Sequence, residues 1–90
     1  MGRYVEGTDT FVVREADGRL KLDAGNPGWP EFDLVPVAAD IFAVGRYEAE
    51  RLAEIYFPAS RVRFLFDVDG AVRLEVVRDE EALVSATRVP

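Results

Sequence analysis

The stretch TFVVREADGRLKLDAG, residues 10–25, decides the fold class of this chain. Apolar and polar residues alternate on both sides of the Asp17-Gly18 pair, and one side of this alternation is almost wholly apolar: Phe11, Val13, Leu20, Leu22 and Ala24. Period-two alternation around an Asp-Gly turn is typical of a β-hairpin with one face in water. The stretch therefore predicts two antiparallel strands.

The same device returns in VRFLFDVDGAVRLEVV, residues 62–77, around Asp69-Gly70. Glycine at the turn supplies the positive φ that such a turn requires. The predicted inward face comprises Val62, Phe64, Phe66, Val72, Leu74 and Val76. Arg63, Arg73 and Glu75 fall on the other face, where we expect solvent rather than a ligand.

Shorter segments complete the pattern. Residues 2–5 and roughly 82–89 predict a first and a last strand, 31–35 a strand that Pro36 ends or bulges, and 41–44 a strand that Gly45 closes. Residues 47–56 carry apolar side chains at helical spacing and helix-spaced ion pairs, so they predict a short helix that Pro58 stops. The competing prediction is a strand through residues 55–57.

About eight strands with short connections predict an antiparallel meander. A flat meander of this size leaves two open edges and an uncovered apolar face, and closure into a barrel removes both problems. We expect a single mainly β domain over residues 1–90, a small eight-stranded antiparallel barrel with one short helical insert at about 47–56. The alternative is a two-layer β-sandwich.

Four segments in this order resemble a known family. They are Gly2-Arg3-Tyr4, FVVREADGRLKLDAG (11–25), FDLVPVAADIFAVG (32–45) and VRFLFDVDGAVRLEVV (62–77). Together they resemble the lipocalin-like domain that follows the catalytic domain in serine β-lactamase-related, penicillin-binding-protein-like hydrolases. The sequence departs from that pattern at 46–60 and in the final SATRVP. The resemblance implies an accessory module without catalytic residues, whose partners are a hydrolase domain or another copy of itself.

Composition excludes several functions. The chain has 17 acidic and 11 basic residues, a net charge of −6, which disfavours nucleic acid and anionic membranes as partners. There is no cysteine and no apolar stretch near the ~20 residues of a membrane helix. The N-terminal residues have no signal-peptide pattern. We expect a soluble protein, cytoplasmic, or periplasmic if the chain belongs to a longer precursor.

Nothing in the sequence marks an enzyme. Histidine is absent, and Ser60 and Ser85 lie in no nucleophile motif, so both are expected to be ordinary polar positions. DVDG at 67–70 lacks the other ligands of a calcium loop, and the acidic run at 78–81 is expected to be a solvated turn. We therefore predict no catalytic residue, metal or cofactor, and rank acid catalysis by unassigned carboxylates last.

The one tryptophan, Trp29, lies in the turn-rich stretch NPGWP between two strands. Such loops lie at the mouth of a barrel, where Trp29 either plugs the interior or rims an entry. Tyr56 and Phe57 are its expected neighbours, if the helical insert folds over the same end. Most aromatic residues are expected to fill the core. The second functional hypothesis is a stand-alone carrier of a small apolar ligand, with Trp29, Tyr56 and Phe57 at the ligand site.

Overall fold

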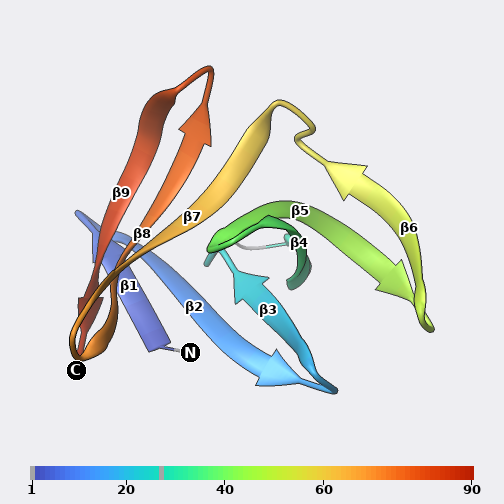
Figure 1. Cartoon of the computed structure of the whole chain (residues 1–90), viewed down its shortest axis with the longest axis horizontal. Helices are drawn as coiled ribbons and strands as arrows, with labels where there is room; N and C mark the ends of the chain where they lie inside the picture. The colour runs from blue at the N-terminus through green and yellow to red at the C-terminus, as the bar shows by residue number, and fades with distance from the viewer. Residues whose placement is uncertain (1, 27) are drawn as a thin grey trace.

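A computed structural model describes residues 2–26 and 28–90. In this part of the chain there are nine β-strands and no helix, and therefore no helix that could cross a membrane (Figure 1). The strands are β1 (Gly2–Glu6), β2 (Asp9–Ala16), β3 (Arg19–Asp23), β4 (Phe32–Ala38), β5 (Ile41–Glu48), β6 (Arg51–Tyr56), β7 (Ser60–Asp67), β8 (Gly70–Arg78) and β9 (Glu81–Val89).

All nine strands belong to one antiparallel sheet. Their order is β4-β3-β2-β1-β9-β8-β7-β5-β6, and β4 also pairs with β5. The additional pairing closes eight strands into a barrel and leaves β6 outside the ring, paired with β5. The predicted antiparallel barrel is thus confirmed, with a ninth strand, β6, in the segment where a helix was the leading prediction. The sandwich alternative is not what forms, because one continuous sheet closes on itself.

The two Asp-Gly turns differ in geometry. Asp17 and Gly18 both have positive φ, 55° and 78°, as a two-residue turn with a right-handed strand twist requires. The second turn lies one residue earlier than predicted, at Val68 and Asp69: Gly70 is the first residue of β8, with a φ of 115°, and Asp69 is not among the positive-φ residues. Instead, the Asp69 backbone N–H donates to the Asp67 carboxylate at 2.7 Å. The repeated sequence therefore makes a hairpin twice, by two local mechanisms.

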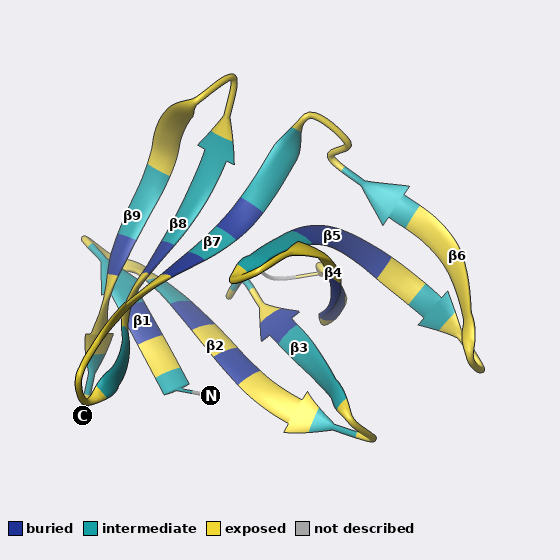
Figure 2. Cartoon of the chain, viewed as in Figure 1, coloured by how far each residue is buried: buried dark blue, intermediate teal, exposed yellow. Residues whose placement is uncertain are grey.

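The predicted inward faces form most of the core. Phe11, Val13 and Leu22 of the first hairpin are buried, as are Val62, Phe64 and Leu74 of the second (Figure 2). Four large side chains are less than 2% exposed and form what we call the packed layer: Tyr4, Leu34, Val62 and Leu74. Phe66 and Val72, predicted to face inward, are exposed instead. The register of β7 and β8 shifts between Leu65 and Phe66, and this bulge breaks the alternation near the turn.

The predicted helix at 47–56 is wrong. Residues up to Glu48 extend β5, Ala49 and Glu50 make a two-residue turn with Ala49 at a φ of 56°, and β6 follows. The competing strand prediction is right for Ile55 and Tyr56. Arg46 lies 3.2 Å from Glu48, two residues along β5, and 3.8 Å from Glu54, opposite it on β6, so its charge partners follow strand geometry and not helical spacing.

Tertiary contacts explain why these helix-forming residues adopt strands. Gly45 pairs with both Asp33 and Ile55, and a Cβ at Gly45 would lie 2.6 Å from the Glu54 carbonyl oxygen. The missing side chain therefore permits β6 to come close to β5. The Arg19 guanidinium lies 3.9 Å from the centre of the Tyr47 ring and also donates to the Ala49 carbonyl. Such contacts outweigh differences in helix propensity of less than ~1 kcal/mol per residue.

Candidate functional site

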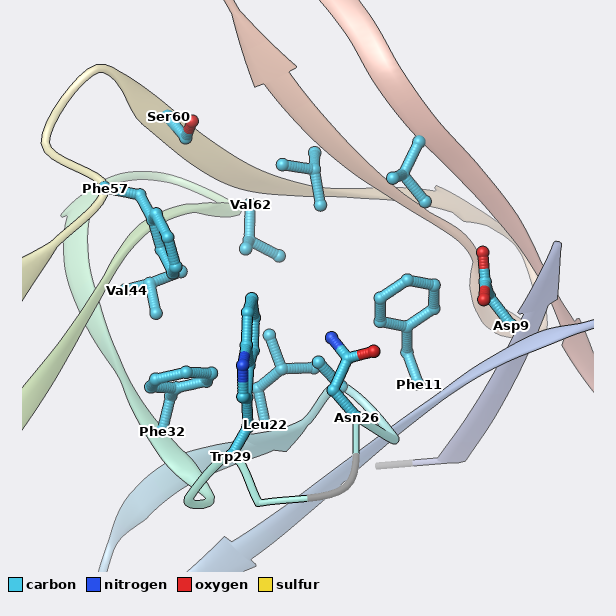
Figure 3. Close-up of a pocket in the computed structure, with 13 residues that line it drawn as sticks. Asp9, Phe11, Leu22, Asn26, Trp29, Phe32, Val44, Phe57, Ser60 and Val62 are labelled. Carbon is cyan, nitrogen blue, oxygen red and sulfur yellow. The ribbon is translucent and has the colours of Figure 1, made fainter.

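A cavity of about 330 Å³ lies inside one end of the barrel and opens to solvent (Figure 3). We call it the end cavity. Its walls are mostly aliphatic and aromatic, and its polar lining residues are Asp9, Asn26 and Ser60. The other lining residues are Phe11, Leu22, Ala24, Trp29, Phe32, Val44, Phe57, Val62, Val76 and Val84. Its size is at the lower end of the range for small-molecule pockets, roughly 300–1,000 Å³.

Strand alternation places these side chains. On β2, Asp9 and Phe11 are two residues apart and share the inward face with buried Val13. On β7, Ser60 and Val62 share the inward face with Phe64 in the same way. Val62 belongs both to the packed layer and to the cavity lining, so the packed layer forms the floor of the cavity. The first inward residues of these strands form its rim.

An aromatic cluster stands at the mouth. The rings of Trp29 and Phe57 stack with centroids 5.8 Å apart and planes inclined by 26°, although they come from segments far apart in the sequence. Phe32 packs edge-on against both, at 5.9 and 6.2 Å. Trp29 and Phe57 nevertheless remain 50% and 49% exposed. Large apolar rings half in water at the entry of a cavity are typical of a ligand site.

The backbone holds this pair in place. The Trp29 N–H donates to the Asn26 carbonyl at 3.1 Å, and the Ser60 N–H donates to the Phe57 carbonyl at 2.8 Å. Phe57 has a φ of 50°, a left-handed conformation that is unfavourable for a bulky residue and costs of order 1 kcal/mol or more. Strain of this kind persists only where the surrounding structure stabilises it, and it is enriched at ligand sites.

Two of the three predicted site residues line the end cavity. Trp29 and Phe57 do so, but Tyr56 is not among the lining residues and packs against Phe32 with ring centroids 5.4 Å apart. The predicted reason for their proximity is wrong, since a strand and a turn, not a helix, bring Tyr56 and Phe57 to this end. Ser60, predicted to be an ordinary polar residue, is at the rim.

The sequence reasoning missed Asp9 and Asn26 as rim residues. The sequence pattern could have identified Asp9, because it lies two residues before Phe11 and therefore on the same face of the strand as Phe11 and Val13. Asn26 gave no such signal, since the β3–β4 loop has no periodicity.

Ser85 and the DVDG stretch have local roles. The Ser85 hydroxyl accepts from Arg73 at 2.5 Å, and the Ser85 N–H donates to Glu6 at 2.6 Å. Asp67 accepts a hydrogen bond within its own turn. In residues 2–26 and 28–90, no group of three or more His, Cys, Asp or Glu side chains is placed to hold a metal ion.

Asp33 is a buried charge on the outer face of β4. Its carboxylate accepts from the Lys21 ammonium and, at 2.7 Å, from the Tyr47 backbone N–H. Burial opposes ionisation, but these two donors outweigh it and hold the pKa of Asp33 below its ordinary value. Asp33 thereby fixes β5 where that strand leaves the barrel, and it is a structural group outside the end cavity.

A second hollow of about 190 Å³ occupies the opposite end of the barrel, lined by Tyr4, Val13, Leu20, Asp40, Phe42, Phe64 and Phe66. It is smaller than the ~300 Å³ of typical ligand pockets. The end cavity is therefore the better candidate site.

Comparison with protein-family models, with curated proteins and with solved structures finds no match for this chain. The resemblance to a lipocalin-like accessory domain therefore stays a prediction, and the case for function depends on the end cavity.

Proposed function

We propose that this barrel is a non-catalytic binding module that holds a small apolar molecule in its end cavity. The observation that carries the proposal is the stacked Trp29–Phe57 pair, half exposed at the mouth of a cavity of about 330 Å³. Apolar walls supply most of the binding free energy, at about 25 cal/mol per Å² of ligand surface buried. The few polar groups at the rim orient the ligand.

Trp29 is the one tryptophan and reports directly on the site. Titration with neutral 2-phenylethanol should change its fluorescence saturably. Ala24 lines the cavity, so Ala24→Phe should fill the space and abolish the saturable change. Ala53→Phe, on the exposed outer strand β6, is the matched control and should bind as the parent does.

A response that does not saturate, or one that is equal in Ala24→Phe and the parent, would contradict the proposal. Circular dichroism of both variants shows whether each retains the β-sheet spectrum. Calorimetry with the same ligand supplies a signal independent of tryptophan.

A second candidate is the accessory role that the family resemblance implies, with a hydrolase domain as the partner. The β5–β6 hairpin supports it, because β6 pairs only with β5 among the described strands and Leu52 on it is 47% exposed. The test is covalent: cross-linking from Leu52→Cys should capture such a partner domain, whereas Val68→Cys, in a fully exposed turn, should not. Equal capture by both variants would reject a role for the hairpin.

A further inference from the structure

We infer that the end cavity selects ligands that carry a positively charged amino group and rejects carboxylates of the same shape. This rests on the proposed function and specifies the chemical class of the ligand. The ligand would be a small aromatic or short aliphatic amine, with its apolar body inside the barrel and its ammonium group at the rim.

Asp9 provides the first observation. It is the exposed first residue of β2, in phase with Phe11 and Val13, so its side chain lines the rim of the cavity. In Figure 3 the carboxylate lies at the edge of the cavity beside the Phe11 ring. Within the described residues, this carboxylate makes no hydrogen bond or ion pair. It is therefore available to a ligand.

The other polar groups at the rim can accept hydrogen bonds from an ammonium group. The Asn26 side-chain carbonyl and the Ser60 hydroxyl can each accept from an ammonium group, which offers three N–H donors. No lysine or arginine occurs among the described residues that line the cavity. A carboxylate ligand would therefore meet one negative charge and no positive charge within the cavity itself.

The turns at the same end of the barrel add negative charge near the cavity. Antiparallel order brings the β1–β2 turn, the β3–β4 loop, the β6–β7 turn and the β8–β9 turn to the end that holds the cavity. The β8–β9 turn consists of Asp79 and Glu80, and the chain carries a net charge of −6. An excess of negative charge around an opening attracts cations and repels anions over several ångströms.

Two arginines, Arg61 and Arg78, lie at the same end of the barrel. The Arg61 guanidinium donates to the carbonyls of Pro58 and Ser60, at 2.9 and 2.8 Å, and does not line the cavity. Arg78 is in phase with Val76 on β8 and stands opposite both Ser60 and Glu81 in the strand register. It is exposed and lies beyond the lining residues, so Arg78 is the group that would favour an anion if the inference were wrong.

The aromatic mouth also suits a cation. Trp29 and Phe57 expose ring surface there, and the negative face of an aromatic ring attracts an ammonium group within about 6 Å. The cavity volume fits one ring with a short side chain better than a long acyl chain. Phenethylamine, 2-phenylethanol and 3-phenylpropionate form a matched series with a cationic, a neutral and an anionic end.

The experiment measures the dissociation constants of these three compounds by calorimetry and Trp29 fluorescence at low salt. We expect phenethylamine to bind about fivefold or more tightly than 3-phenylpropionate, with 2-phenylethanol between them, as one partly exposed charge pair implies. Asp9→Asn should remove most of this difference and leave the affinity for 2-phenylethanol unchanged. Asp79→Asn makes the same charge change at the same end outside the cavity, and should retain most of the preference.

Other outcomes separate this inference from the proposed function. Binding of 2-phenylethanol with equal or tighter binding of 3-phenylpropionate would overturn the amine selectivity and leave the apolar site standing. A preference for the amine that Asp9→Asn does not reduce would overturn the role of Asp9. Absence of saturable binding by all three compounds would overturn both.

Discussion

The packed layer and the mouth of the end cavity use large apolar side chains in opposite ways. Tyr4, Leu34 and Leu74 in the packed layer are at most 1% exposed, whereas Trp29 and Phe57 at the mouth are about half exposed. Burial stabilises roughly in proportion to the apolar area removed from water. Each side chain of the packed layer therefore contributes more to stability than a half-exposed ring does, and the mouth retains exposed apolar surface after folding. The Phe57 backbone at the mouth is also strained, with a φ of 50°, which lowers stability further at this end.

The largest effect should come from the packed layer. Leu74→Ala leaves a cavity around a fully buried position and should lower the free energy of unfolding by about 3–5 kcal/mol. Leu83→Ala is the matched control, since Leu83 on β9 is 56% exposed, and it should cost no more than about 0.5 kcal/mol. Urea denaturation measures both. Similar losses would mean that the two positions are not distinguished by burial.

Asp33 connects the two regions, because it fixes the strand that leads through β6 to Phe57. Asp33→Ala removes an acceptor that serves two donors and leaves Lys21 without its partner, so it should cost about 2–4 kcal/mol at neutral pH. It should also weaken binding of 2-phenylethanol, because Phe57 loses its fixed position.

The same residue predicts a pH dependence. A folded-state pKa below the ordinary ~3.9 means that ionised Asp33 contributes stability above that pH and loses it as the pH falls through the folded-state value. The stability difference between the parent and Asp33→Asn should therefore be largest near pH 6–7 and shrink below about pH 4. Chemical denaturation across pH 2–7 tests this, and a constant difference would contradict the role of its charge.

A substitution at Gly18 alters the end of the barrel that is remote from the cavity. Gly18→Val forces a β-branched residue to a φ near 78° and should cost about 1–3 kcal/mol, observable as a lower midpoint in thermal unfolding. Ligand affinity should not change, since the Asp17-Gly18 turn lies at the opposite end. A change in affinity without a change in stability would contradict this separation.

Trp29→Ala should affect stability less than Leu74→Ala does, and it should strongly weaken binding. About half of the Trp29 side chain is buried, so the expected loss is about 1–2 kcal/mol, less than for Leu74→Ala. Calorimetry should show at least a tenfold loss of affinity for 2-phenylethanol. A large fall in melting temperature with unchanged affinity would make Trp29 part of the core and remove the contrast with the packed layer.

Much of the fold could be predicted from particular residues. The alternation around Asp17-Gly18 and Asp69-Gly70 predicted both hairpins and most of their buried faces, because a half-buried strand imposes period two on its own residues. Pro36 predicted the end or bulge of its strand, and the register does shift between Pro36 and Ala38. Local chemistry was sufficient in each case.

The candidate site was predicted only in part. Trp29 and Phe57 were expected at one end of the barrel, and both line the end cavity, but Phe57 was placed there by a predicted helix where the structure has strands. Asn26 could not be anticipated, because a loop residue has no pattern that fixes its direction. The stacking of Trp29 on Phe57 depends on two loops that meet only after the barrel closes.

By itself the sequence determined that this chain is an antiparallel β-structure with an acidic surface, since alternation, turn glycines and charge are local properties. Only the tertiary structure decided the state of residues 47–56, whose helical spacing yields to the contacts of Gly45, Asp33 and Arg19. It also decided that the barrel has an open cavity at one end. A cavity is the space that side chains from many strands leave unfilled, and no single segment encodes that space.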